Sequence, residues 1–364
     1  MEHRKLKEII DIKTGKLDAN ASSENGKYPF FTCSKDTLKI DTYSYDCECV
    51  LLAGNGDLNV KYYNGKFDAY QRTYILENKS NIISVKYLYY FMQKYVETLR
   101  KQAIGGVIKY IKLSNINEAF IPIYSAKEQN KIIKEISQIE QIINIRGKQI
   151  EELDNIIKSQ FVEMFGNPVL NEKHWKVELL GNLGNFKNGM NFNKTNEGHK
   201  IKFLGVGDFN KGTIINNINL LENINLNEKP SDDYMLKNKD IVFVRSNGSK
   251  ELVGRSTLID DIEEEITYSG FCIRFRKKLE ELNVRYLIEL FQNKEFFNYL
   301  KKDSRGANIN NINQQMLSNL KIILPPIELQ NQFAEIVKQI DKQKFESVIE
   351  LREIQKNIFY KWGR

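Results

Sequence analysis

The chain has 364 residues, with 54 Lys or Arg against 47 Asp or Glu, and a net charge of +7. This length suits two ordinary domains, and the mild basic excess favours an anionic partner. No stretch approaches the roughly 20 apolar residues of a membrane span, the start has no apolar signal region, and the cysteines and histidines lack the paired spacing of a zinc site. The composition predicts a soluble, reduced, cytoplasmic protein without a bound metal.

The second half of the sequence repeats the first. Seven residues between Gly105 and Ile139 recur 201 positions later, between Gly306 and Ile340. Upstream, other segments match at offsets of 174, 192 and 199, so the connecting loops differ in length between the two copies. Similar but unequal copies predict two related domains with different surfaces.

In chain order, the first copy begins with a mixed segment of short strands and turns. The apolar run Cys49–Ala53 predicts a strand, and the turn signal Asn55-Gly56 follows it. An amphipathic pattern over about Val85–Gln102 predicts a helix. A heptad pattern then runs from Ala126 to Met164 and, sustained over five heptads, predicts a coiled-coil helix. At ~1.5 Å per residue, that helix is about 58 Å long.

The second copy keeps this order. It has an apolar run at Asp240–Val244, the turn signal Asn247-Gly248, a helix over about Val284–Lys302 and a long helix from about Glu328 to Trp362. Neither long helix can bury its apolar stripe alone, so we expect the two to pair as an antiparallel coiled coil with the mixed domains at opposite ends. The expected seam residues are Ile132, Ile136, Ile139, Ile143, Ile150, Leu153, Ile157, Phe333, Val337, Ile340, Leu351, Ile354 and Ile358.

Catalytic motifs of several classes are missing. Pro325-Pro326 follows Leu324, whereas methyl transfer to an exocyclic amino group uses Asp or Asn at that point. The string Gly205–Asn210 lacks the third glycine of a dinucleotide fingerprint, and no glycine-rich loop leads into Lys and then Ser or Thr. The sequence therefore predicts a binding protein without catalytic residues.

Several strings occur in the same order in both copies. Ile322–Gln330 and Phe120–Gln129 each lead a strand into a long helix, although the first copy has Tyr124-Ser125 in place of Pro325-Pro326. With Ala53–Gly56, Arg245–Ser249 and Gly306–Asn310, they resemble the DNA specificity (S) subunit of type I restriction-modification systems, over nearly the whole chain. Each string is weak by itself, but their order, twice over, is a strong signal.

The resemblance implies an α+β fold with two tandem α/β target recognition domains, separated by two long helices that pair as an antiparallel coiled coil in a pseudo-twofold internal repeat. The recognition domains would be residues 1–125 and 166–326, and the spacer helices residues 126–165 and 327–364. Each domain would read one half of a bipartite, asymmetric target in double-stranded DNA.

The resemblance also implies partners. Two modification (methyltransferase) subunits would dock on the helical region, and restriction (motor nuclease) subunits would join them. This chain would hold no cofactor, because S-adenosylmethionine, ATP and Mg would belong to those partners.

Base reading needs Arg, Lys, Asn or Gln on loops that reach a groove, and phosphate contacts need further basic or small polar donors. Each candidate also has an ordinary structural explanation: a hairpin turn for Asn247-Gly248, a solvated strand face for Arg274 and Arg276, and a helix cap for Asn310. The candidates are Asn55, Asn59, Lys61, Gln71, Arg72, Lys109, Arg245, Ser246, Asn247, Ser249, Lys250, Arg255, Arg274, Arg276, Arg305, Asn308 and Asn310.

Two other classes of function remain open. The chain is alternatively a coiled-coil scaffold that binds other proteins without reading DNA sequence, although its basic balance and Arg-rich and Asn-rich loops argue against this. The other class is a fused restriction and modification enzyme, and the length of the chain and the missing catalytic motifs argue against it. Salt would separate DNA binding from a hydrophobic scaffold interface, because counterions compete only with the former.

Overall fold

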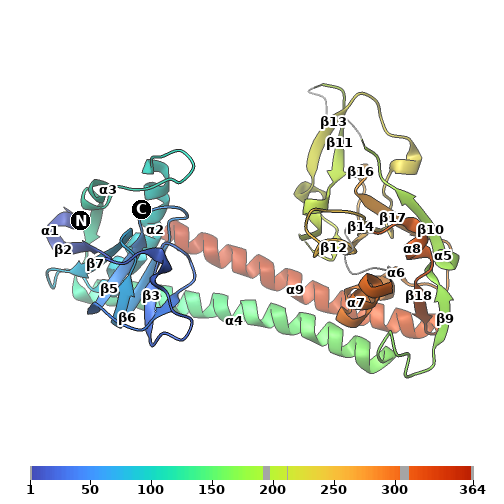
Figure 1. Ribbon diagram of the computed structural model, residues 1–364, viewed down its shortest axis with the longest axis horizontal. Helices are drawn as coiled ribbons and strands as arrows, with labels where there is room; N and C mark the ends of the chain where they lie inside the picture. Colours follow the sequence, from blue (N-terminus) through green and yellow to red (C-terminus); the bar gives the residue numbers. More distant parts are fainter. Residues whose placement is uncertain (1, 192–196, 211, 304–310, 362–364) are drawn as a thin grey trace. The chain divides into compact units, whose positions relative to one another are not determined.

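The computed structural model describes residues 2–191, 197–210, 212–303 and 311–361, apart from the side chains of residues 302–303 and 355–361. The chain divides into two compact units, Met1–Asn144 with Asn357–Arg364, and Ile145–Lys356. In Figure 1 the helices and strands are coloured along the sequence, from blue at the N-terminus to red at the C-terminus. None of the described helices is both long enough and apolar enough to cross a lipid bilayer.

The first unit holds a mixed domain and the start of a long helix, α4 (Ala126–Phe165). Its other elements are β1 (Glu2–Lys5), α1 (Leu6–Ile9), β2 (Ile10–Thr14), η1 (Ala19–Ala21), β3 (Tyr28–Phe31), β4 (Leu38–Ile40), β5 (Tyr45–Ala53), β6 (Val60–Ala69), β7 (Thr73–Asn78), α2 (Val85–Gln102), α3 (Leu113–Asn117) and β8 (Phe120–Ile123). A six-stranded sheet has the order β2-β7-β5-β6-β3-β4, and a two-stranded sheet pairs β1 with β8.

The larger of the two buried clusters of this domain lies between its sheet and α2. The predicted apolar run forms the end of the central strand β5, where all five residues from Cys49 to Ala53 are buried. Helix α2 has its predicted bounds and is capped by Ser84, whose hydroxyl accepts a hydrogen bond from the Tyr87 backbone N–H. Leu88 of α2 joins Val50 of β5 in one buried cluster.

The second unit repeats this plan with a larger insertion. Its elements are β9 (Lys176–Leu179), α5 (Leu180–Leu183), β10 (Gly184–Asn188), β11 (His199–Leu204), η2 (Val206–Asn210), β12 (Ile214–Ile215), η3 (Ile218–Leu220), β13 (Glu222–Leu226), η4 (Asp232–Tyr234), β14 (Ile241–Val244), β15 (Ser256–Ile259), β16 (Ile266–Tyr268), β17 (Cys272–Lys277), α6 (Val284–Gln292), α7 (Lys294–Asp303), α8 (Gln314–Ser318), β18 (Lys321–Leu324) and α9 (Ile327–Lys361). The main sheet has the order β10-β17-β14-β15-β12, beside the smaller sheets β13-β11-β16 and β18-β9.

Two expectations for this unit are wrong in detail. The pattern over Val284–Lys302 predicted one helix, but Asn293 is extended and separates α6 from α7. Its side-chain oxygen accepts hydrogen bonds from the backbone N–H groups of Glu295 and Phe296, so it caps α7. Asn247-Gly248 is not a two-residue hairpin turn, because the connection between the paired strands β14 and β15 runs from Arg245 to Arg255.

A buried glutamine attaches each long helix to its own domain. The Gln129 amide oxygen accepts from the Ser84 N–H at 2.9 Å, and its amide nitrogen donates to two backbone carbonyls. The Gln330 amide does the same with the Asn283 N–H at 2.9 Å and two further carbonyls. Every polar atom of both buried amides is therefore satisfied, which makes the sequence repeat a structural repeat.

The two long helices pair within the second unit, and their direction is antiparallel. Arg146 lies 2.9 Å from Glu350 and Asp154 lies 2.5 Å from Lys344, while the rings of Phe161 and Phe333 are 5.6 Å apart. The partner residue falls in number as the α4 residue rises, as antiparallel helices require.

The predicted seam accounts for only part of the helical packing. Ile132 packs against the first-domain core, and Ile157, Phe333, Val337 and Ile340 belong to the second-domain core. Ile136 is also buried, and Ile139, Ile143, Ile150, Leu153, Leu351 and Ile354 are half-buried, whereas the Ile358 side chain lies outside the described residues. The long helices are therefore parts of the domain cores as well as partners of each other.

Candidate nucleic-acid interface

Three loops of the first domain are joined by backbone hydrogen bonds. The Gly54 N–H, after β5, donates to the Arg72 carbonyl at 2.9 Å, and the Ile111 N–H donates to the Gly54 carbonyl at 2.9 Å. The Gly56 N–H donates to the Lys109 carbonyl, also at 2.9 Å. We call this arrangement the three-loop frame. It brings together four of the predicted DNA-binding residues: Asn55, Gln71, Arg72 and Lys109.

The second domain has the same three-loop frame. The Arg245 N–H donates to the Phe271 carbonyl at 2.7 Å, and the Ile312 N–H donates to the Arg245 carbonyl at 2.8 Å. The β-bridge between Ser246 and Asn311 corresponds to the bridge between Asn55 and Tyr110.

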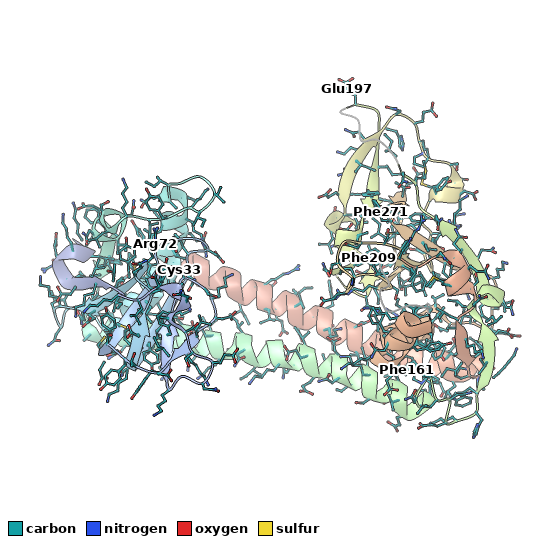
Figure 2. The ribbon with its side chains drawn as sticks, in the orientation of Figure 1. Cys33, Arg72, Phe161, Glu197, Phe209 and Phe271 are labelled. Carbon is teal, nitrogen blue, oxygen red and sulfur yellow. The ribbon has the colours of Figure 1, made fainter. Side chains whose placement is uncertain are left out.

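Equivalent points of the two frames carry unlike side chains. Arg245 stands where the first domain has Gly54, and Phe271 stands where it has Arg72. Figure 2 labels Arg72 and Phe271 in their own domains. The backbone that carries the loops is thus duplicated, but the chemistry presented is not.

The polar side chains of the frames differ in their exposure and in their hydrogen bonds within the chain. Arg72 and Lys109 are exposed, and no ion pair holds either side chain in the described part of the chain. Gln71 is exposed and donates to Asp18 at 3.2 Å, and Asn55 is half-buried. The half-buried Arg245 guanidinium lies 3.5 Å from the Gly270 carbonyl oxygen.

The loop after β14 carries the remaining polar candidates of the second domain. The Asn247 side-chain oxygen accepts from the Ser249 N–H at 3.0 Å, so this amide shapes the loop. Ser246 is half-buried, whereas Ser249 and Lys250 are exposed.

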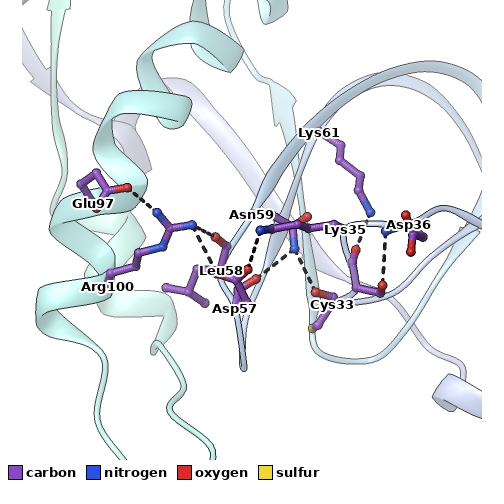
Figure 3. Close-up of polar contacts among 10 residues, drawn as sticks. Cys33, Lys35, Asp36, Asp57, Leu58, Asn59, Lys61, Glu97 and Arg100 are labelled. Carbon is purple, nitrogen blue, oxygen red and sulfur yellow. Dashed lines mark hydrogen bonds and ion pairs between the residues drawn. The ribbon is translucent and has the colours of Figure 1, made fainter. Parts of the chain in front are cut away.

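Asn59 and Lys61 are part of a loop-to-loop network, which Figure 3 shows. The Asn59 amide donates to the Cys33 carbonyl at 2.9 Å, and the Lys61 ammonium donates to the Ser34 carbonyl at 2.6 Å. Burial lowers the pKa of Lys61. Nearby, Arg100 donates to the Leu58 carbonyl at 2.6 Å. These contacts hold the loop after β3 on the start of β6, which is a structural role.

The expectation of an exposed basic face on β17 is wrong. Arg274 is only 5% exposed and donates to the Asp233 carbonyl at 2.9 Å. Arg276 makes two hydrogen bonds of 2.7 Å to the carboxylate of Asp240, which is fully buried. Both arginines therefore bind the interior of their own domain, because a carboxylate and backbone carbonyls of neighbouring segments lie within reach.

Of the four remaining DNA-binding candidates, one is exposed and three lie where the structure gives no description. Arg255 is exposed and donates to the Asn210 amide oxygen at 2.9 Å. Arg305, Asn308 and Asn310 lie outside the described residues.

One frame residue was missed by the sequence analysis. Phe271 is 57% exposed and follows Arg72 by 199 positions, which is one of the offsets of the repeat. That offset signals the equivalence, but an aromatic residue in a sequence is more often part of a core than a stacking platform, so the sequence alone did not single out Phe271.

A separate cavity of about 630 Å³ lies in the second unit between α4, α6, α9 and the β12 region. Arg285 lies 3.3 Å from Asp341 there, and Lys344 lies near both Asp154 and Asp341. Burial, and then the nearby Asp341, raise the pKa of Glu289 to about 7. No group of three His, Cys, Asp or Glu side chains suited to a metal ion occurs among the residues with described positions.

Comparison with known proteins places the chain in a family. The model for the type I restriction modification DNA specificity domain matches residues 1–155 and 172–355. The EcoDI specificity subunit of Escherichia coli is 35% identical over 153 residues, which are 42% of this chain but only 34% of that protein. The MjaVIII specificity subunit of Methanocaldococcus jannaschii is 27% identical over 311 residues, which are 80% of this chain and 72% of that protein.

Solved structures share the fold. The S subunit of a type I restriction-modification system from M. genitalium has a TM-score of 0.56 at 18% identity, covering 98% of this chain and 93% of that one. A chain from a structural study of type I complex assembly and conformational transition has a TM-score of 0.57 at 14% identity, covering 98% and 95%. Because the family match covers both halves of the sequence, this chain belongs to the family of DNA specificity (S) subunits of type I restriction-modification systems.

Proposed function

We propose that this chain reads a bipartite, asymmetric target in double-stranded DNA, one half-site with each mixed domain. Residues 1–125 and 166–326 are the two target recognition domains, and residues 126–165 and 327–364 are the helices that separate them. The observation that carries the proposal is the duplicated three-loop frame with unlike side chains at equivalent points. A common backbone with different side chains is what two readers of different half-sites require.

The residues proposed to contact DNA belong to the loops of these frames. In the first domain they are Asn55, Gln71, Arg72 and Lys109. In the second domain they are Arg245, Ser246, Asn247, Ser249 and Lys250, together with Arg255 beside this loop and, from the sequence, Arg305, Asn308 and Asn310. Asn59, Lys61, Arg274 and Arg276 are assigned instead to the structure of their domains, because their polar groups are bound internally.

The helical pair is the proposed docking surface for two modification (methyltransferase) subunits, which restriction (motor nuclease) subunits then join. Several apolar residues off the paired faces are exposed, among them Ile145 and Ile156 of α4 and Phe345 and Ile349 of α9. The first two line a groove of about 610 Å³ between the helices. Exposed apolar groups beside a groove are typical of a protein interface. S-adenosylmethionine, ATP and Mg are then cofactors of the partner subunits.

The test is to express the chain with the modification subunits encoded beside it and to map methylated adenines in the host DNA. We expect one sequence with two specified parts separated by unspecified bases. The chain alone is expected to bind that sequence, more weakly as salt rises, and to methylate nothing. Methylation by the chain alone would refute the proposal and favour an enzyme. Salt-independent binding of other proteins, with no DNA target found, would refute it in favour of a scaffold.

A further inference from the structure

Phe271 has no evident role in the core of the second domain. It lies between β16 and β17, and 57% of its surface is exposed, although the neighbouring residues Ser269, Gly270 and Cys272 are buried. Neither core cluster of this region includes its side chain. A single exposed aromatic residue is not unusual by itself, but this one is held by a rigid backbone and lies on the three-loop frame.

The backbone that carries Phe271 is fixed on two sides. Its carbonyl accepts from the Arg245 N–H at 2.7 Å, and its own N–H donates to the Ser269 hydroxyl at 3.2 Å. The preceding Gly270 donates to the Met190 carbonyl at 2.8 Å, and a Cβ atom on Gly270 would lie 2.1 Å from the Asn191 side-chain oxygen. An exposed ring on a tightly held turn loses little freedom on binding, which suits a recognition residue.

Phe271 is also part of the three-loop frame, with the Arg245 guanidinium beside the same turn. It occupies the position of the exposed Arg72 in the first domain. A phenyl ring cannot bind phosphate or read a hydrogen-bonding edge. What it offers DNA is a flat apolar face, and such side chains insert between base pairs or stack on unpaired bases.

We propose that Phe271 stacks on DNA bases and opens one base step in the half-site read by the second domain. This inference rests on the proposed function. The first domain offers apolar groups at another point of its frame: Val107 and Ile108 are 103% and 62% exposed. They lie on a loop closed by two hydrogen bonds between Ile104 and Tyr110.

The alternative occupant of this surface is a protein partner. Two identical modification subunits would contact equivalent positions of the two domains, so we would expect similar side chains at those positions. The frames instead present Phe271 and Arg72 at the equivalent point. Difference between the copies fits unlike DNA half-sites better than identical protein partners.

The experiment uses the full-length chain with its modification subunits and a duplex that carries the mapped target. 2-Aminopurine replaces adenine at each possible position of one half-site in turn, and its fluorescence rises when stacking is lost. We expect an increase at one step of the half-site read by the second domain. Phe271→Ala should abolish that increase and weaken target binding roughly tenfold, as expected for the loss of one aromatic stacking contact. Phe271→Tyr should preserve both.

Phe120→Ala is the matched control, because Phe120 is an exposed phenylalanine of β8, at 56%, outside both frames and outside the helical pair. It should leave DNA affinity of the chain alone and the fluorescence unchanged. Unchanged fluorescence and affinity in Phe271→Ala would overturn the stacking role while leaving the proposed function intact. If Phe271→Ala no longer binds the modification subunits but the variant chain alone keeps its DNA affinity, the stacking role is overturned in favour of a protein contact. Absence of specific binding by the unaltered protein would overturn both proposals.

Discussion

Arg276 and Asp240 illustrate the limit of sequence reasoning at the scale of single residues. On β17, the alternation of Arg274 and Arg276 was compatible with an exposed basic face, and nothing in the local sequence distinguished that from an internal role. The decisive partner, Asp240, comes just before β14, the strand that pairs with β17. A contact between residues 36 positions apart depends on strand pairing, so the local pattern could not predict it.

Replacing Arg276 by Met should destabilise the second domain without changing the DNA target. The substitution leaves the fully buried Asp240 carboxylate without its cation, and breaking a buried ion pair in this way costs about 3 kcal/mol. Urea unfolding of the full chain measures this loss. Arg255→Met, at an exposed arginine, should change the free energy of unfolding by less than about 0.5 kcal/mol. An altered target with unchanged stability would assign Arg276 to DNA instead.

Glu289 should make stability depend on pH near neutrality. Its pKa is about 7 in the folded chain against 4.5 for an ordinary glutamate, so the folded state binds the extra proton between these values. This proton binding adds at most about 3 kcal/mol to the free energy of unfolding. The full amount is present below about pH 4.5 and is lost as pH rises through 7. The groups that face Glu289 are Asp341 and Asp154, which raise its pKa, and Arg285 and Lys344, which lower it.

Thermal unfolding between pH 5 and pH 8 tests this expectation. The unaltered protein should lose stability over that range, and Glu289→Gln should lose less, so that the variant is the more stable of the two at pH 8. Glu280→Gln, at a side chain that is 99% exposed, is the control and should follow the unaltered protein. Parallel curves for all three proteins would show that Glu289 is already ionised when folded.

At the scale of elements, the heptad pattern predicted the first long helix well. The heptads placed the first long helix at Ala126–Met164, and it is observed at Ala126–Phe165. The same pattern could not show that Phe161 and Phe165 of that helix pack on the Tyr286 ring, because Tyr286 lies on α6, far along the chain. Nor did periodicity reveal the break at Asn293, where a single capping side chain outweighs a continuous amphipathic pattern.

Gln330→Leu should separate α9 from its domain. Leucine has a similar size, but it leaves the Asn283 N–H and the carbonyls of Glu281 and Pro325 without partners in a buried site. Unsatisfied buried groups of this kind cost about 1–3 kcal/mol each, so we expect a loss of about 3 kcal/mol in urea unfolding. Gln339→Leu, at an exposed glutamine of the same helix, is the matched control. Equal stability of the two variants would contradict the structural role of Gln330.

At the scale of the whole molecule, the framework is repeated and the loops are not. The glutamine contacts and the three-loop frames recur in both halves, although Arg245 follows Gly54 by 191 positions, Phe271 follows Arg72 by 199 and Ile312 follows Ile111 by 201. The proposed interface was predictable only where charged or amide side chains mark it, as at Arg72 and Arg245, and Phe271 carries neither kind of group. Under the proposed function, the repeated framework would hold two DNA-reading domains in the same way, and the unlike side chains would give each domain a different target.

If each domain reads one half-site, as proposed, Arg72→Ala and Arg245→Ala should have reciprocal effects. Each substitution should relax the choice of base at one position in one half-site, by roughly 10-fold to 100-fold, because a good side-chain contact to a base edge contributes about 1–3 kcal/mol of discrimination. Methylation of duplex libraries randomised in one half-site at a time, by the assembled complex, measures this. Lys278→Ala, at an exposed lysine outside the frame, is the control and should leave the sequence preference at both half-sites unchanged. Equal loss at both half-sites from either arginine variant would mean that the two domains do not read DNA independently.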